Sequence, residues 1–378
     1  LLSLIESCRK KNFPAKVKLI VSDNPKAPGL KYAKQYRIPF KVITKNFENT
    51  LLRILERHSI DIICLAGFMK ILSKNNKLDK LNKYSKPNWI NSPKIDFEKN
   101  FLELDLREMK NCEKAVSGMD TIFHLADVVA GIDFVFGNEA FVYRSNILIN
   151  SNMFQAAHKA KLEKFAYVGA ACAYPLEKQN NPDQPLFKEE DMYPAHPESS
   201  YGWGKLMGEY ECELYSKTGM LDASILRLHN VYGPHSDLST QKSQVIPATI
   251  RKAIQYPKED FIIWGNGEQS RAFIYVSDVV EALILSMEKG INKGPIQIGN
   301  AKKTTINEIA DKVIEISGKD IEKKYDLSKP TGDLGRAADC SLAEDVLGWK
   351  PKVGLEEGLK MTYEWAEQFL KSYPSICN

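Results

Sequence analysis

Helix-length and strand-length patterns of apolar residues alternate along most of the chain. Over the first 73 residues, apolar positions at helical spacing alternate with short continuous apolar runs. We expect helices over 1–11, 29–36 and 47–59, and strands over 17–21, 39–43 and 61–66. Alternation of this kind favours a parallel sheet with helices on both of its faces.

The alternation is interrupted over residues 74–99. This segment is rich in Lys and Asn, contains Pro87 and Pro93, and shows neither helical nor strand periodicity. We therefore expect a linker or a fusion seam between a segment 1–73 and a domain 100–378. Because the chain starts at Leu1 within an expected helix, we expect a fragment or a processed product.

A second series of strands and helices follows from residue 100. We expect strands over 101–106, 121–126, 164–170 and 223–231, and helices over 107–118, within 138–161 and over 201–218. After Gly233 the pattern loosens, which predicts a smaller α/β lobe that ends near Trp365. The expected fold class is therefore α/β, a doubly wound parallel sheet with a smaller C-terminal lobe.

Composition and charge exclude several classes of protein. The 378 residues are 43% hydrophobic and 26% charged, which is typical of soluble globular proteins, and no apolar run is long enough to span a membrane. The seven cysteines are scattered without metal-ligand spacing, which predicts a cytoplasmic location and no metal site. The first 100 residues hold 21 Lys and Arg against 8 Asp and Glu. These lysines are dispersed through amphipathic segments, so we expect no nucleic-acid partner.

Tyr201 and Lys205 form the first candidate catalytic pair. They are four residues apart in an expected helix and therefore share one face. The hydroxyl of a Tyr titrates near pH ~10, and we expect the ammonium of Lys205 to lower the pKa of Tyr201. Solvated helix surfaces produce the same spacing, but the position after AACAYP (170–175) favours a phenol that moves a hydroxyl proton during hydride transfer.

No glycine-rich turn for a dinucleotide is found in the sequence. Before residue 137 the glycines are Gly29, Gly67, Gly118 and Gly131, and no pair of them has the spacing of such a turn. That turn supplies the backbone N–H groups that hold a pyrophosphate, so the sequence predicts weak dinucleotide binding.

Residues 100–370 carry several motifs of one enzyme family in order. The motifs are DTIFHLAD (120–127), AACAYP (170–175), YGWGK (201–205), RLHNVYGPH (227–235), VIPATIRKA (245–253), WGNGEQSRAFIYVSD (264–278) and LGWKP (347–351). By these motifs the segment resembles the extended short-chain dehydrogenases of the NAD-dependent epimerase/dehydratase family, nearest to the GDP-mannose 3,5-epimerases and GDP-fucose synthases. The resemblance implies a Rossmann-like sheet without the family's first βαβ unit and a substrate lobe mainly after residue 233.

The resemblance also implies roles for particular residues. Tyr201 and Lys205 would serve hydride transfer, with Lys205 reaching the nicotinamide ribose, and Cys172 would exchange protons beside a transient ketone. The cofactor, NAD or NADP, would contact Asp105, Leu125, Ala126, Asp127, Asn146, Val168, Lys205 and Asn230. The nucleotide sugar, expected to be GDP-linked, would contact Asn230, Gln244, Lys252, Trp264, Arg271 and Arg336. A homodimer stays open as the assembly.

Three positions depart from the pattern of that family. Ala170 stands where the family has a Ser or Thr that hydrogen-bonds the reacting oxygen, and losing one such donor costs on the order of 10²–10³ in rate. Gln244 stands where the family has a His or Lys that partners the cysteine, and Gln cannot transfer protons near neutral pH. Asp127 replaces a usual Ala, and its charge would oppose a pyrophosphate. The substitutes for Gln244 that stay open are Lys242, His235 and His229.

Residues 1–73 resemble a second family, the phosphoribosylglycinamide formyltransferases. The matching pieces are VSDNPKAPGLKYAKQYRIP (21–39) and LAGFMKILS (65–73), and the second would place Met69, Lys70, Ile71 and Leu72 at a folate pocket. The family's Asn-x-His-Pro catalytic segment has no counterpart after Ser73. Because formyl transfer needs an acid or base beside the amine, we expect a structural remnant.

We therefore hypothesise an NAD(P)-dependent nucleotide-sugar epimerase that acts on a GDP-hexose through a 4-keto intermediate. Two alternatives stay open: a 4,6-dehydratase or reductase on the same fold, and an inactive chimera that at most binds a nucleotide sugar. An acidic residue next to the Tyr–Lys pair would favour dehydration, whereas AACAYP favours epimerisation.

Overall fold

The computed structural model of the protein describes residues 20–22, 29–42, 102–129, 131–180, 185–240, 243–332 and 334–372. The chain separates into two compact units, Leu1–Leu102 and Glu103–Asn378. Four expected elements lie outside the described residues: the helices over 1–11 and 47–59, the strand over 61–66 and the linker over 74–99. None of the helices in the described ranges is both long and apolar enough to cross a membrane.

The described part of the first unit is a short strand–helix–strand sequence. It consists of β1 (Ile20–Ser22), α2 (Gly29–Gln35) and β2 (Phe40–Val42), and β1 pairs in parallel with β2. Parallel neighbours need a crossover connection, and α2 lies within it. The helix expected over 29–36 and the strand expected over 39–43 are confirmed, and β1 overlaps the end of the strand expected over 17–21.

The second unit is built on a four-stranded parallel sheet. The strand order is β10 (Pro295–Ile298), β5 (Ala223–Leu228), β4 (Lys164–Ala170) and β3 (Thr121–His124). Nearly every residue of β4 and β5 is buried, as expected for parallel strands that helices cover on both faces. The doubly wound α/β fold expected from the alternation is therefore confirmed.

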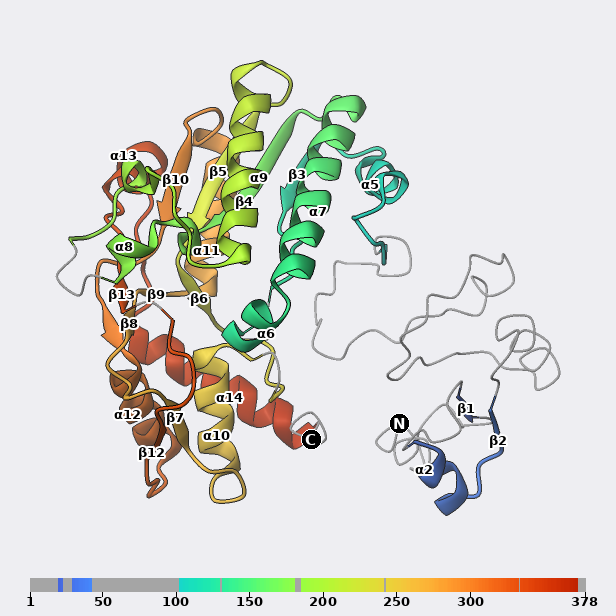
Figure 1. Ribbon diagram of the computed structural model, residues 1–378, viewed down its shortest axis with the longest axis vertical. Helices are drawn as coiled ribbons and strands as arrows, with labels where there is room; N and C mark the ends of the chain where they lie inside the picture. The colour runs from blue at the N-terminus through green and yellow to red at the C-terminus, as the bar shows by residue number, and fades with distance from the viewer. Residues whose placement is uncertain are drawn as a thin grey trace. The chain divides into compact units, whose positions relative to one another are not determined.

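Helices pack on both faces of this sheet (Figure 1). One face carries α5 (Met109–Val116), α7 (Glu139–Ala160) and α9 (Ser200–Lys217), and the other carries α11 (Val276–Lys289) and α13 (Ser341–Leu347). Successive side chains of β4 divide between the two cores, since Phe165 and Tyr167 join the first and Val168 joins the second. Successive residues of a strand point to opposite faces, so one strand supports both cores.

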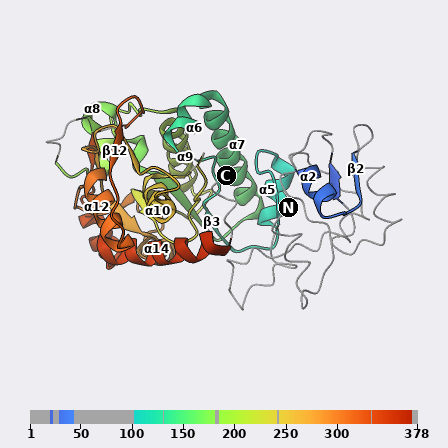
Figure 2. The same cartoon turned by 90° about the horizontal axis from the view of Figure 1, so that it is seen from below.

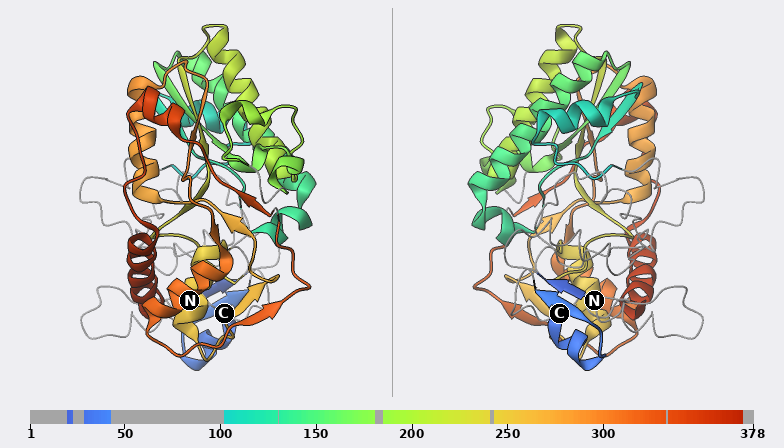
Figure 3. Two further views of the ribbon diagram at one scale, coloured as in Figure 1. Left: turned by 90° about the vertical axis from the view of Figure 1, so that its left-hand side faces the viewer. Right: turned by 90° about the vertical axis from the view of Figure 1, so that its right-hand side faces the viewer.

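The smaller lobe is formed mainly by α10 (Val245–Gln255), α12 (Ile306–Ser317) and α14 (Leu355–Ser372). These helices pack against one another around a core that includes Phe261, Ile309 and Leu359. Figure 2 shows α14 along the side of this lobe, and Figure 3 shows the lobe at one end of the sheet. The fold expected from the sequence, a parallel sheet with a smaller C-terminal α/β lobe, thus agrees with this arrangement.

Short strands complete the smaller lobe and its junction with the sheet. The strands are β6 (Asn230–Tyr232), β7 (Ile262–Trp264), β8 (Ser270–Arg271), β9 (Phe273–Tyr275), β11 (Thr304–Thr305), β12 (Lys324–Asp326) and β13 (Gly335–Arg336). Among them, β6 pairs with β9, β7 pairs with β12, and β8 lies between β11 and β13. The remaining elements are α6 (Ile132–Gly137), α8 (Leu176–Gln179) and the 3-10 turns η1 (Ala171–Ala173) and η2 (Glu189–Met192).

Two strand predictions are wrong. Residues 102–106 form no strand, because the Asp105 carboxylate accepts hydrogen bonds from the backbone and the guanidinium of Arg107, which favours a turn. The strand expected over 223–231 is divided at His229. Its first part, β5, pairs with β4 and β10, whereas its second part, β6, pairs with β9. The chain therefore leaves the main sheet at this point and enters the junction with the smaller lobe.

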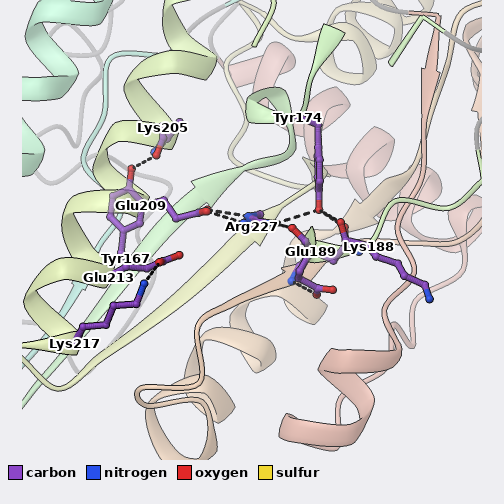
Figure 4. Close-up of polar contacts among 10 residues, drawn as sticks. Tyr167, Tyr174, Lys188, Glu189, Lys205, Glu209, Glu213, Lys217 and Arg227 are labelled. Carbon is purple, nitrogen blue, oxygen red and sulfur yellow. Dashed lines mark hydrogen bonds and ion pairs between the residues drawn. The ribbon is translucent and has the colours of Figure 1, made fainter. Parts of the chain in front are cut away.

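A buried ion pair joins the sheet to α9 (Figure 4). The Arg227 guanidinium donates to both carboxylate oxygens of Glu209, at 2.8 and 2.7 Å, and the two side chains are only 3% and 2% exposed. Arg227 also donates to the carbonyl oxygen of Glu189 at 2.7 Å and to the hydroxyl of Tyr174 at 3.4 Å. A buried pair needs this degree of satisfaction to offset the desolvation of its charges. It fixes β5, α9 and the segment after β4 relative to one another.

Replacing Glu209 with Gln should lower the free energy of unfolding by about 3–5 kcal/mol, because Arg227 would stay buried with its charge uncompensated. Urea denaturation followed by tryptophan fluorescence measures this loss. Glu213→Gln is the matched control: Glu213 lies one turn further along α9 and pairs at 2.9 Å with the exposed Lys217. Such a surface pair contributes little to stability, because water and salt screen its charges. Equal losses in both variants would contradict a special role for the buried pair.

Candidate active site

One cavity of about 1090 Å³ contains most of the predicted site residues. It is lined by the carboxyl ends of β4 and β5, by the start of α9, and by residues of α10, β7, β8 and β13. The predicted site residues in its wall are Val168, Cys172, Tyr201, Asn230, Gln244, Lys252, Trp264, Arg271 and Arg336. Those outside its wall are Asp105, Leu125, Ala126, Asp127, Asn146 and Lys205. The complete predicted substrate set therefore shares one cavity with Cys172 and Tyr201.

Cys172 is positioned by a close approach between η1 and α9. The Oγ atom of Ser199 caps α9 by accepting a hydrogen bond from the backbone N–H of Gly202 at 3.2 Å. A Cβ atom on Gly202 would collide with the carbonyl oxygen of Cys172, so only a glycine allows this contact. The first turn of α9 consequently lies against η1, and Tyr201 and Cys172 enter the same cavity wall.

Arg336 reaches Cys172 from the distant strand β13. Its Nη2 atom lies 3.4 Å from the sulfur of Cys172, and its Nη1 atom donates to the side-chain oxygen of Gln179 in α8. The guanidinium is always charged, and Arg336 is only 6% exposed. A fixed positive charge therefore lies beside the thiol. Nothing in the sequence indicated Gln179, since neither its spacing nor a motif marks it.

Lys205 is paired with Asp127. Its Nζ atom lies 2.6 Å from Oδ2 of Asp127 and donates to the carbonyl oxygen of Val168 at 2.9 Å. The side chains of Lys205 and Asp127 are 5% and 6% exposed. The same Nζ atom lies 5.8 Å from the centre of the Tyr201 ring. The ammonium thus lies near the phenol as predicted, but its closest partner is a carboxylate.

The prediction that Lys205 lowers the pKa of Tyr201 is wrong. Burial raises the pKa of Tyr201 well above its usual range, and the negative charge of Asp127 raises it further. Burial also raises the pKa of Asp127, and the neighbouring Lys205 opposes that effect. The sequence pattern could not show this outcome, because Asp127 meets Lys205 only when β3 pairs with β4 and α9 packs against β4.

Of the remaining predicted cofactor residues, Leu125, Ala126 and Asn146 lie around the end of β3, whereas Asp105 precedes α5. The buried Asn146 side chain accepts from the backbone N–H of Val128 at 2.7 Å and donates to its carbonyl oxygen at 3.1 Å, which holds the segment that carries Asp127. Leu125 and Ala126 are exposed. The Asp105 carboxylate is bound by Arg107 at 2.6 Å. Contact of these residues with a dinucleotide stays a prediction.

Two arginines lie side by side in the cavity wall. Arg271 on β8 and Arg336 on β13 are direct partners in the parallel register, and they are 8% and 6% exposed. Arg271 also donates to the carbonyl oxygens of Ser270 and Thr331. Like charges at paired positions repel each other. The arrangement therefore suits an anion with more than one charge, and guanidinium groups match phosphate oxygens in geometry.

The wall next to the smaller lobe combines an ammonium, an indole and amides. Lys252 donates to the carbonyl oxygen of Ile262 at 2.5 Å, and burial lowers its pKa. The Nζ atom of Lys329, a residue that the sequence did not single out, lies 5.3 Å from the ring centre of Trp264. Gln244 precedes the first turn of α10. The Oδ1 atom of Asn230 is buried without a hydrogen bond among the described residues. These groups can bind a polar ligand.

Three residues were candidates to replace Gln244 as the proton-transfer partner of Cys172, and only one of those that the structure describes lines the cavity. His229 does so, but its Nε2 atom is bonded to Gln297 at 3.1 Å, and burial lowers its pKa to about 4. His235 is exposed and contacts the ring of Trp365, while Lys242 lies outside the described residues. Among the residues that the structure describes, no group of three or more His, Cys, Asp or Glu could hold a metal ion.

Comparison with known proteins assigns this arrangement to a family. The model of the "NAD dependent epimerase/dehydratase family" matches residues 51–299. The chain belongs to the NAD-dependent epimerase/dehydratase family. The resemblance inferred from the motifs is confirmed, and by family the chain is an NAD-dependent epimerase with NAD or NADP as its cofactor. A formyl transferase model matches residues 1–81, which confirms the second resemblance and overlaps the first match over 51–81.

Relatives in this family act on nucleotide sugars. GDP-mannose 3,5-epimerase of Arabidopsis thaliana is 34% identical over 70% of this chain and 70% of its own length. GDP-L-fucose synthase 1 of the same plant is 29% identical over 74% of this chain and 85% of its own length. The structure of UDP-glucose 4-epimerase from Thermotoga maritima superposes with a TM-score of 0.66 at 24% identity, covering 93% of this chain and 99% of that chain, which shows the shared fold.

The described residues fit the family's dinucleotide only in part. Lys205 and Tyr201 lie beside the carboxyl ends of β3 and β4, where open α/β sheets bind such cofactors. Leu125 and Ala126 leave the end of β3 exposed. No G-x-G-x-x-G turn lies between a strand and a helix in the described ranges. The nicotinamide end therefore fits, except for the carboxylate of Asp127.

Two buried histidines should make the fold sensitive to acid. Burial lowers the pKa of His124 and of His229 to about 4, against 6.5 for an exposed His. The unfolded chain therefore binds protons below pH 6.5 that the folded chain takes up only near pH 4. Stability is full above pH 6.5 and falls as the pH decreases, by about 2 kcal/mol per histidine between pH 7 and pH 5.

Denaturation midpoints between pH 7 and pH 5 measure this loss. In His124→Phe, which places an apolar ring among Phe154, Phe165 and Tyr167, the dependence on pH should weaken. Stability at pH 7 should also fall, because Asn150 would lose the hydrogen bond that it shares with His124. An unchanged slope in this variant would show that His124 is not a source of the acid sensitivity.

Proposed function

We propose that this chain epimerises a GDP-linked hexose through a transient ketone. The observation that carries the proposal is a single cavity that contains Tyr201, Cys172 and the register-paired Arg271 and Arg336. The two plant relatives, 34% and 29% identical, are named for GDP-linked sugars, and this supports guanosine diphosphate as the carrier of the sugar.

The paired arginines would bind the diphosphate of this substrate. Two adjacent guanidinium groups can each place two N–H donors on phosphate oxygens. Arg336 also lies 3.4 Å from the sulfur of Cys172, so the diphosphate site and the thiol are neighbours. A hexose attached to the diphosphate would consequently lie close to Cys172 and Tyr201. Lys252 and Trp264 remain for the nucleoside, since both line the same cavity.

Two side chains would divide the proton transfers between them. When bound, the NAD(P) cofactor takes a hydride from the sugar and later returns it. The hydroxyl of Tyr201 moves the proton of the sugar hydroxyl at the oxidised carbon. A ketone at that carbon acidifies the adjacent C–H bonds, and the sulfur of Cys172 removes and returns one of these protons. Ala170, which lines the cavity without a donor, predicts a slow reaction.

Dehydration is less well supported than epimerisation. An acid that eliminates water must reach the sugar, and the carboxylate nearest to the Tyr201–Lys205 pair is that of Asp127. Asp127 is 2.6 Å from Lys205 and is not part of the cavity wall. Cys172 is part of that wall, and a thiol suits proton exchange beside a ketone.

Cys172→Ser should abolish proton exchange and leave the redox half-reaction intact. A Ser hydroxyl is too weak an acid to replace a thiol near neutral pH. We expect deuterium from D₂O to enter C3 and C5 of GDP-mannose with the unchanged chain, and at least about 100-fold more slowly with the variant. NMR of the sugar measures this uptake. Tyr201→Phe should abolish both uptake and nicotinamide reduction, because every later step needs the ketone.

Cys340→Ser provides the matched control. Cys340 is a half-buried cysteine outside the cavity wall, so its loss should leave deuterium uptake unchanged. Unchanged uptake in Cys172→Ser would reduce Cys172 to a packing residue and favour a reductase. Absence of uptake in the unchanged chain, with GDP-mannose bound, would contradict epimerisation itself.

A further inference from the structure

The carboxylate of Asp127 lies against Lys205, the ammonium that the family resemblance assigns to the nicotinamide ribose. Its two oxygens are buried. Lys205, the backbone N–H of Val128 and the hydroxyl of Tyr201 approach them, but none of these contacts has well-aligned hydrogen-bond geometry. What compensates its charge is the Nζ atom of Lys205 at 2.6 Å. A buried carboxylate whose other donors are poorly aligned holds its counter-ion strongly, because separating the two charges leaves both desolvated.

The donors of Lys205 are largely committed in this arrangement. An ammonium has three N–H groups. One of them is donated to the carbonyl oxygen of Val168 at 2.9 Å. A second faces the carboxylate of Asp127, whose Oδ2 atom lies 2.6 Å from Nζ. Two hydroxyls of a nicotinamide ribose would need two donors, and one is left. The ring of Tyr201, whose centre is 5.8 Å from Nζ, competes for the same charge.

The backbone on both sides of Asp127 is held in place. The segment that carries it is held on both polar backbone groups of Val128 by the buried Asn146, at 2.7 and 3.1 Å. The strand β3 that precedes it is held in register with β4, from Thr121↔Lys164 to His124↔Tyr167. The backbone that carries Asp127 is therefore fixed beside Lys205, and the side chain itself is only 6% exposed.

We propose that Asp127 is a built-in brake on this enzyme: it withholds Lys205 from the dinucleotide and from Tyr201. It is a positioning residue that acts through Lys205. The inference rests on the proposed roles of Lys205 and Tyr201. It does not depend on the identity of the sugar.

Binding of NADH to the full 378-residue chain tests the proposal. Nicotinamide fluorescence reports the titration and needs no turnover. Asp127→Asn keeps the shape of the side chain and removes its charge, so we expect NADH to bind at least tenfold more tightly. Asp127→Glu keeps the charge and should give no gain. Asp345→Asn removes an exposed carboxylate outside the cavity wall and should change the affinity less than twofold.

An increase in affinity cannot arise from damage to the fold, which separates a brake from a purely structural ion pair. Affinity that is unchanged or lower in Asp127→Asn would overturn the proposal, and so would an equal gain in Asp345→Asn. Asp127→Ala serves as a second variant, since it restores the residue usual in the family. If neither variant folds, the ion pair is a structural requirement and the proposal fails.

Deuterium uptake into GDP-mannose distinguishes failure of this inference from failure of the proposed function. Uptake by the unchanged chain, with no gain of NADH affinity in Asp127→Asn, would leave epimerisation standing and overturn the brake alone. Tighter NADH binding in Asp127→Asn, without uptake in any variant, would support the brake and contradict the proposed substrate.

Discussion

The buried pair of Arg227 and Glu209 is the interaction on which the catalytic half of this structure depends. It connects the centre of the sheet to α9, and its further hydrogen bonds reach Tyr174 and the backbone of Glu189. Both charges are desolvated, so the pair is stable only while every partner stays in place. A Cβ atom on Gly169 would lie 3.1 Å from the carboxylate of Glu209, so the neighbouring strand also leaves room for it.

The hydrogen bonds of Arg227 and Tyr174 fix the backbone on which the candidate active site is built. Tyr174 belongs to the turn that follows β4, and its hydroxyl bonds to Gln297 on β10 as well as to Lys188. Cys172 lies two residues earlier in that turn, and Gly202 brings the start of α9 against it. Arg336 then arrives from the smaller lobe. Three distant segments therefore meet at Cys172 because polar contacts beneath it fix their positions.

Asp127 shows a different use of buried charge. The ion pair with Lys205 compensates two desolvated charges, yet it directs the ammonium toward a carboxylate. Burial raises the pKa of Tyr201, and the negative charge of Asp127 raises it further. The same contact that stabilises the folded chain thus opposes formation of a phenolate.

The sequence by itself determined the alternating architecture, the strand 164–170, the helix that carries Tyr201 and Lys205, and the residues that line the cavity. These features depend on local periodicity and on motifs, which lie within short stretches of chain. Only the tertiary structure decided that Asp127 pairs with Lys205, that Arg271 and Arg336 are register partners, and that the pKa of Tyr201 is raised. It also decided that residues 102–106 form no strand. Each of these outcomes depends on contacts between residues far apart in sequence and on how far burial removes water from the charged groups. The spacing of residues along the chain determines neither the contacts nor the burial.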